Sequence, residues 1–147
     1  MRKIALAVSA VLLLLVINAC KKTDNSTSGS SNAKTVQNLS GSYNLTNLTA
    51  SFLGASTSLY DSLPACEKDN IIQLNTDLSV HFIDAGVVCV PPSDSTGTWS
   101  LSSNSDTLNV AGSAGFIKSW DGKTLVLTSN ELISGFSVLA TTTLVKK

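Results

Sequence analysis

The sequence has few of the residues on which catalytic and nucleic-acid-binding sites depend. It contains one histidine, His81, and one arginine, Arg2, at the second position of the chain. Arginine makes most bidentate contacts to phosphates and guanine edges, so we expect no nucleic-acid partner. G-x-S-x-G, H-E-x-x-H and glycine-rich phosphate-loop motifs are also missing from the sequence. We therefore expect no enzymatic activity, no catalytic residue and no cofactor.

One long apolar run is present, and it lies at the N-terminus. Met1-Arg2-Lys3 precedes an apolar stretch from Ile4 to Ile17 that only Ser9 interrupts. A charged start, an apolar run and a small residue at its end are typical of a secretory signal peptide. The run is shorter than the roughly 20 residues that a membrane-spanning helix needs. We expect a cleaved signal peptide in place of a transmembrane anchor.

The end of this segment resembles the lipobox of bacterial lipoproteins. Ile17 is the aliphatic residue three positions before Cys20, and Ala19 is the small residue directly before it. The resemblance implies a lipoprotein signal peptide over residues 1–19 and fatty acylation of Cys20, for example with palmitate. Two or more acyl chains anchor a protein stably, and we expect anchoring in the outer membrane, facing either the periplasm or the outside. The alternative is an ordinary secretory signal that leaves Cys20 free.

Without the signal peptide, the chain consists of a polar tether and one domain. Loss of Arg2 and Lys3 leaves eight basic residues against ten acidic ones. Residues 20–38 are mainly Lys, Ser, Thr, Asn and Gly and lack the apolar content that a core requires. Residues 39–147 are long enough for one domain and too short for two. No long apolar stretch is expected on the surface, which favours a monomer.

The domain has the pattern of an all-β protein. Runs that are rich in Val, Leu, Ile and Thr, or that alternate between apolar and polar residues, recur about every ten residues. They predict strands near residues 41–49, 70–75, 78–84, 97–102, 106–111, 115–120, 123–129 and 134–145. The mature chain shows no sustained helical periodicity. About eight antiparallel strands in chain order favour an up-and-down β-barrel, because closure removes exposed sheet edges.

The connections between these strands differ in length. Asp121-Gly122-Lys123 is the strongest hairpin signal in the chain. The longest connection covers residues 50–69. Its larger apolar residues are Phe52, Leu53, Leu59, Tyr60 and Leu63. A connection of this length is usually a lid, a binding loop or locally helical, and its apolar residues also suit a cover over one end of the core.

Cys66 and Cys89 are the two cysteines that remain after Cys20. An exported chain enters an oxidising compartment, where such a pair forms a disulfide. This bond closes a loop of about 24 residues and stabilises the fold by about 3 kcal/mol. The alternative is a metal site that combines the two cysteines with His81. Because zinc sites usually contain closer pairs such as C-x₂-C, which are missing here, we expect the disulfide and no metal.

Four segments together resemble the small lipocalin-like lipoproteins of Gram-negative bacteria. They are Gly41-Ser42-Tyr43, Ala65-Cys66-Glu67-Lys68-Asp69-Asn70, Cys89 with its proline-rich loop, and Gly97-Thr98-Trp99-Ser100-Leu101. The resemblance covers about residues 39–147 and implies a barrel with room for an apolar cavity. The chain departs from lipocalins at three points: Tyr43 replaces the tryptophan of G-x-W, no C-terminal arginine packs against it, and Leu78 follows Asp77 where the related sequences favour glycine.

The large aromatic residues of the predicted strands are the candidates for the barrel interior. They are Tyr43, Phe82, Trp99, Phe116, Trp120 and Phe136. An eight-stranded barrel is just wide enough to be filled by side chains or to hold one small ligand, so these residues either form the core or line a cavity. We expect a non-enzymatic, lipid-anchored protein that binds a small apolar ligand. The alternative is a surface module that recognises a protein or a glycan through the loops 50–69 and 89–96.

Overall fold

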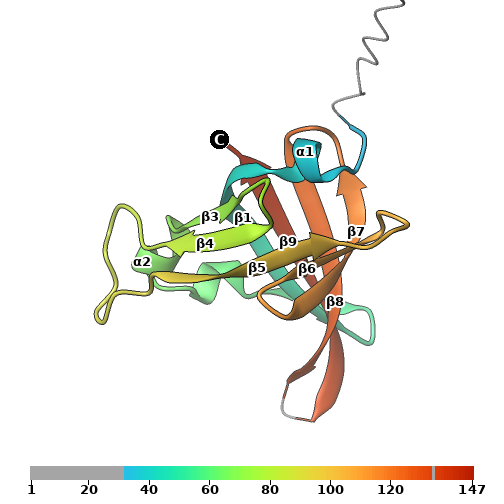
Figure 1. Cartoon of the computed structure of the whole chain (residues 1–147). Coiled ribbons are helices and arrows are strands. Elements are labelled where there is room, and N and C mark those ends of the chain that lie inside the picture. Colours follow the sequence, from blue (N-terminus) through green and yellow to red (C-terminus); the bar gives the residue numbers. More distant parts are fainter. Residues whose placement is uncertain (1–31, 134) are drawn as a thin grey trace, which may run out of the picture.

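The computed structural model of the protein describes residues 32–133 and 135–147. The predicted signal peptide, Cys20 and most of the predicted tether lie outside the described residues. The helices are α1 (Val36–Leu39), the 3-10 helix η1 (Tyr60–Ser62) and α2 (Ala65–Lys68). The strands are β1 (Gly41–Phe52), β2 (Ala55–Ser58), β3 (Ile71–Leu74), β4 (Ser79–Ile83), β5 (Ser95–Leu101), β6 (Thr107–Val110), β7 (Ser113–Trp120), β8 (Thr124–Ile133) and β9 (Phe136–Lys146) (Figure 1).

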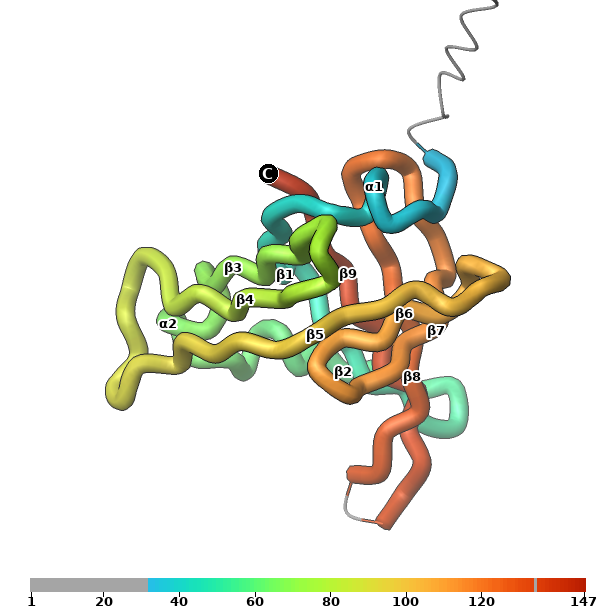
Figure 2. Tube along the Cα trace, in the orientation of Figure 1, coloured from blue at the N-terminus to red at the C-terminus, as the bar shows by residue number. Residues whose placement is uncertain are grey.

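Eight of these strands close into an antiparallel β-barrel. β1 and β3 to β9 follow one another around the barrel, and β1 pairs with β9 to complete the ring. The trace in Figure 2 shows how each strand returns beside the one before it. The predicted all-β, up-and-down barrel of about eight strands is confirmed, and each predicted strand is present with its ends shifted by a few residues.

The long connection after β1 contains the ninth strand and two short helices. β2 folds back on β1 and pairs residues 55–58 with residues 49–52. Further along the chain, β3 pairs with residues 41–44 of β1. β1 therefore has β2 and β3 as neighbours at its two ends, and η1 and α2 bridge the space between them. Of the interpretations open for residues 50–69, the locally helical one is confirmed.

α1 lies across one end of the barrel (Figure 1). The helix begins after Thr35, whose side-chain oxygen accepts a hydrogen bond from the backbone N–H of Asn38 at 3.2 Å. Leu39 at its end is fully buried, and Val36 packs against the same core. Residues 36–38, which were predicted to belong to the tether, are therefore part of the folded domain.

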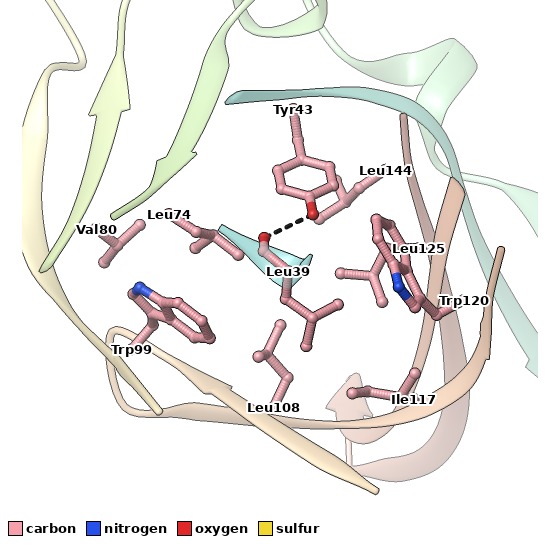
Figure 3. Close-up of a cluster of buried hydrophobic side chains, with 10 residues drawn as sticks. All are labelled: Leu39, Tyr43, Leu74, Val80, Trp99, Leu108, Ile117, Trp120, Leu125 and Leu144. Atoms are coloured by element: carbon pink, nitrogen blue, oxygen red, sulfur yellow. Dashed lines mark hydrogen bonds between the residues drawn. The ribbon is translucent and has the colours of Figure 1, made fainter. Parts of the chain in front are cut away.

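The barrel interior near α1 is filled by side chains from many strands (Figure 3). The buried cluster consists of Leu39, Tyr43, Leu74, Val80, Trp99, Leu108, Ile117, Trp120, Leu125 and Leu144. Trp99 is the largest fully buried side chain, and its indole N–H donates to the carbonyl oxygen of Asn75 at 2.8 Å. Burying these apolar groups supplies the main stabilisation of the fold. These side chains form a packed core in this half of the barrel.

Tyr43 joins the first strand to the helix that closes the barrel. Its hydroxyl donates a hydrogen bond to the carbonyl oxygen of Leu39 at 2.6 Å. Burial raises the pKa of Tyr43 to about 12. The ammonium group of Lys146 lies 5.9 Å from the centre of the Tyr43 ring and 5.8 Å from that of Trp120, and burial lowers the pKa of Lys146. The Tyr43 side chain thus links β1, α1 and the end of β9 at this end of the barrel.

We expect the folded protein to lose stability as the pH rises from about 10 to about 12. In the unfolded chain Tyr43 ionises near pH 10, whereas burial keeps it protonated to about pH 12 in the fold. The unfolded state therefore releases its proton first, and unfolding becomes easier with rising pH. Urea titrations of the wild type and of Tyr43→Phe from pH 8 to pH 12 measure this effect. The free energies of unfolding of the two proteins should converge above pH 10. Curves that stay parallel over the whole pH range would contradict the burial of the Tyr43 side chain.

Polar side chains stabilise the turns at this end of the barrel. In the predicted hairpin, the carboxylate of Asp121 accepts hydrogen bonds from the N–H groups of Thr124 (2.6 Å) and Lys123 (2.8 Å), which lower the pKa of Asp121. The side chain and N–H of Ser79 lower the pKa of Asp77 in the same way. Leu78 has a φ of 68°, in the left-handed region. Glycine adopts this conformation more readily than leucine does.

Candidate functional site

Four of the six predicted interior aromatic residues face the interior of the barrel. Tyr43, Trp99 and Trp120 belong to the packed core, with exposed fractions of 8% or less. Phe82 is half-buried and packs against this core from β4. Side chains fill the barrel near α1, whereas Phe82 also lines an open pocket farther from this helix.

The prediction that Phe116 faces the interior is wrong, because the side chain is 62% exposed. In a regular strand, Phe116 and Trp120 would share one face. The pairing of β7 with β8 shifts register between Ile117 and Ser119, and this bulge changes the alternation. Ile117 and Trp120 both become buried, and Phe116 lies on the outer face.

The prediction for Phe136 is wrong for a different reason. Phe136 is two residues before the buried Val138 and four before the buried Ala140. Residues at this spacing share one face of a strand, so Phe136 lies on the inner side of β9. The β8–β9 hairpin, however, continues past its last pairing with β1, at Leu139. Phe136 consequently lies beyond the end of the barrel and is 60% exposed. Figure 1 shows the hairpin projecting below the other strands.

A pocket lies away from α1, where β3 begins and β4 ends. Its volume is about 350 Å³, and it is open to solvent. Its walls come from β1, the helical connection, β3, β4 and the start of β5. The lining residues are Leu45, Leu48, Leu63, Glu67, Asn70, Ile71, Ile72, Phe82, Ser93 and Ser95. The floor is aliphatic and aromatic, whereas polar groups lie on one side.

A disulfide holds the polar side of the pocket together. Cys66 in α2 is bonded to Cys89 in the connection from β4 to β5, with an S–S distance of 2.05 Å. The predicted disulfide is therefore confirmed. Asn70 strengthens the same junction, because its side-chain N–H donates to Ser93 Oγ at 3.1 Å. Glu67, Asn70 and Ser93 are thereby held around the opening.

Carboxylates order the β4–β5 connection by accepting hydrogen bonds from backbone N–H groups. Asp84 accepts from Ser93 at 2.9 Å and from Cys89 at 3.0 Å. Asp69 accepts from Val87 at 2.8 Å. Gly86 has a φ of +63°, and a Cβ atom at this position would clash with the Asp69 carboxylate. Only glycine allows this close approach.

The tips of two neighbouring hairpins form an exposed apolar surface. Leu53, at the turn between β1 and β2, is 90% exposed, and Leu132 in β8 is 79% exposed. Phe52 and Phe136 join the two hairpins through an edge-to-face contact, with their ring centres 5.5 Å apart. We call these four residues the apolar tips. Large exposed apolar groups that gather in one place often mark interaction sites.

Other kinds of site are not found in the part of the chain that the structure describes. His81 is exposed on β4. No group of three His, Cys, Asp or Glu side chains in residues 32–133 and 135–147 is suited to hold a metal ion. Nor does any helix in these ranges have the length and apolar character needed to cross a membrane.

Most residues that line the pocket were missed by reasoning from the sequence. Leu48, Leu63 and Ile71 are aliphatic and carry no motif, and only the fold brings them together. Leu63 was noted among the apolar residues of the long connection. The cysteine pair gave the best available signal, because a disulfide between this connection and the segment after β4 brings both to the same opening.

Comparisons with known protein families, with curated proteins and with solved structures found no match for this chain. The closed barrel of eight antiparallel strands is compatible with a lipocalin-like fold.

Proposed function

We propose that this protein is a non-enzymatic, lipid-anchored lipoprotein of the outer membrane whose lipocalin-like barrel binds a small apolar ligand. The pocket bounded by Leu48, Ile71 and Phe82 is the observation that carries the proposal. Small-molecule sites are usually apolar hollows of about 300–1,000 Å³ with a few polar groups. A volume of about 350 Å³ lies at the lower end of that range.

The packed half of the barrel limits how deeply a ligand enters. Trp99 and Tyr43 fill the interior near α1. A ligand therefore lies at the opening, with one side against Leu45, Ile72 and Phe82 and the other side toward solvent. This arrangement suits a small apolar or amphiphilic molecule and does not suit a large ligand that needs complete enclosure.

The position of the pocket is consistent with a lipid anchor on Cys20. The chain enters the domain through α1, and the pocket opens away from this helix. Lys34 precedes α1, and Lys146 donates to the carbonyl oxygen of Asn38 at 2.9 Å. Lysines at this end suit the neighbourhood of lipid head groups. A domain tethered in this way keeps its pocket accessible from the side remote from the anchor.

Filling the pocket with a larger side chain should abolish binding. Leu48→Trp places an indole where the ligand would lie, and we expect at least a tenfold loss of affinity for the neutral dye N-phenyl-1-naphthylamine. The titration follows dye fluorescence with protein exported behind a standard secretory signal and carrying Cys20→Ser. Leu139→Trp is the matched control, because Leu139 is 45% exposed on the outer face of neighbouring β9. Failure of the wild type to bind, or equal binding by both variants, would contradict the proposal.

A second candidate function is recognition of another protein through the apolar tips. The exposure of Leu53 and Leu132 favours it, and this surface runs against the expectation that no apolar stretch would be exposed. A photo-crosslinking residue at position 53 should then give one discrete product in intact cells. The same residue at position 118, on the outer face of β7, should give none. Equal labelling at both positions would remove this candidate.

A further inference from the structure

Charge is unevenly distributed between the two ends of the domain. The segments that border the pocket, residues 60–70 and 84–94, carry five carboxylates and one lysine. The carboxylates are Asp61, Glu67, Asp69, Asp84 and Asp94. Four of the six described lysines lie instead at the α1 end or close to it. They are Lys34, Lys123, Lys146 and Lys147.

The lysine beside the pocket is turned toward a different group. Lys68 donates a hydrogen bond to the carbonyl oxygen of Asp61 at 3.1 Å, and its ammonium group lies 5.5 Å from the centre of the Tyr60 ring. Lys68 is not among the residues that line the pocket, and Glu67 is the one charged residue among the described residues that do. The local field at the opening is therefore negative.

One carboxylate group that lines the pocket has capacity to interact with a ligand. Within the described residues, the Glu67 side chain makes no hydrogen bond or ion pair, and it is exposed at the edge of the apolar floor. Asp69 and Asp84 do not line the pocket, but they add negative charge to the segments around it. Carboxylates grouped along a recess raise the local concentration of cations. They also disfavour anions.

We propose that the pocket selects amphiphiles whose polar head is an ammonium group over neutral or carboxylate-bearing amphiphiles with the same alkyl chain. The apolar floor of Leu48, Ile71 and Phe82 contacts the alkyl chain, and Glu67 pairs with the head group. This inference rests on the proposed ligand-binding function, and it adds the chemical class of the ligand. It also predicts that preference for the cation weakens as salt screens the carboxylates.

Three probes of equal chain length test the proposal: octylammonium, octanol and octanoate. Their affinities are measured by isothermal titration calorimetry on the Cys20→Ser protein at low and high salt. Octylammonium should bind about fivefold more tightly than octanol at low salt, which is the ratio for two unit charges about 4 Å apart in water. Octanoate should bind more weakly than octanol. The difference between octylammonium and octanol should shrink in 0.5 M salt.

The variant Glu67→Gln should remove this preference and leave octanol binding within twofold of the wild type. Glu131→Gln is the matched control, because Glu131 is exposed on β8 and does not line this pocket. Binding of octanol without preference for octylammonium, or a preference that survives Glu67→Gln, would overturn the inference and leave the proposed function standing. Failure of all three probes to bind would overturn both.

Discussion

Replacing Trp99 with alanine should lower the free energy of unfolding by about 3–5 kcal/mol. Trp99 is 1% exposed, and its indole N–H donates to the carbonyl oxygen of Asn75. The substitution removes a large apolar group from the centre of the core and one of the two hydrogen bonds that this carbonyl accepts, the other coming from the backbone N–H of Leu78 at 3.1 Å. Because domains of this size are stable by about 5–15 kcal/mol, the loss is a large fraction of the total. Urea denaturation followed by far-UV circular dichroism measures it.

Phe116→Ala provides the matched control for this result. Phe116 is also an aromatic residue of a barrel strand, but it is 62% exposed. Exposed side chains contribute little to stability, so we expect a loss below about 1 kcal/mol. Comparable losses for the two variants would contradict the assignment of Trp99 to the core and Phe116 to the surface.

Removing the disulfide should have the second largest effect on stability. Cys66→Ala together with Cys89→Ala opens a link between residues 23 positions apart, and we expect a loss of about 3 kcal/mol, largely because the unfolded chain gains freedom. The bond also joins α2 to the β4–β5 connection. Ligand affinity should therefore fall together with stability. Urea denaturation and dye titration on the same preparation measure the two effects.

Reductant gives an independent control for the disulfide. Under conditions in which Cys66 and Cys89 are reduced, the wild type should unfold at the urea concentration of the double variant. The double variant should not respond to reductant. If it unfolded at the same urea concentration as the oxidised wild type, the bond would have no stabilising role.

The alternation of apolar and polar residues along the sequence predicts most of the strands of the barrel. Eight strands, the Asp121 hairpin and the Cys66–Cys89 pair were predicted because each has a local signal: period-two alternation, turn residues, or two cysteines in an exported chain. Tyr43 and Trp99 were predicted to lie in the interior as large aromatic residues of strands, and both are buried. Local signals were sufficient here because neighbours in the chain are mostly neighbours in the barrel.

The remaining features depend on how far each strand extends and where it is irregular. The bulge near Lys118 reverses the side on which Phe116 lies, and no turn or glycine residue marks it. The length of the β8–β9 hairpin beyond β1 exposes Phe136. The pocket is formed by aliphatic residues from several segments, and their meeting at one opening follows from the closure of the ring. These are properties of the assembled barrel, so alternation alone does not predict them.

The most direct test of ligand binding in the pocket is to locate a bound alkyl chain on the protein by nuclear magnetic resonance. Intermolecular nuclear Overhauser effects between octanol and the methyl groups of the Cys20→Ser protein report which side chains lie next to the ligand. The pocket predicts contacts with Leu48, Leu63 and Ile71. Contacts confined to Leu53 and Leu132 at the apolar tips, or no contacts at all, would contradict it.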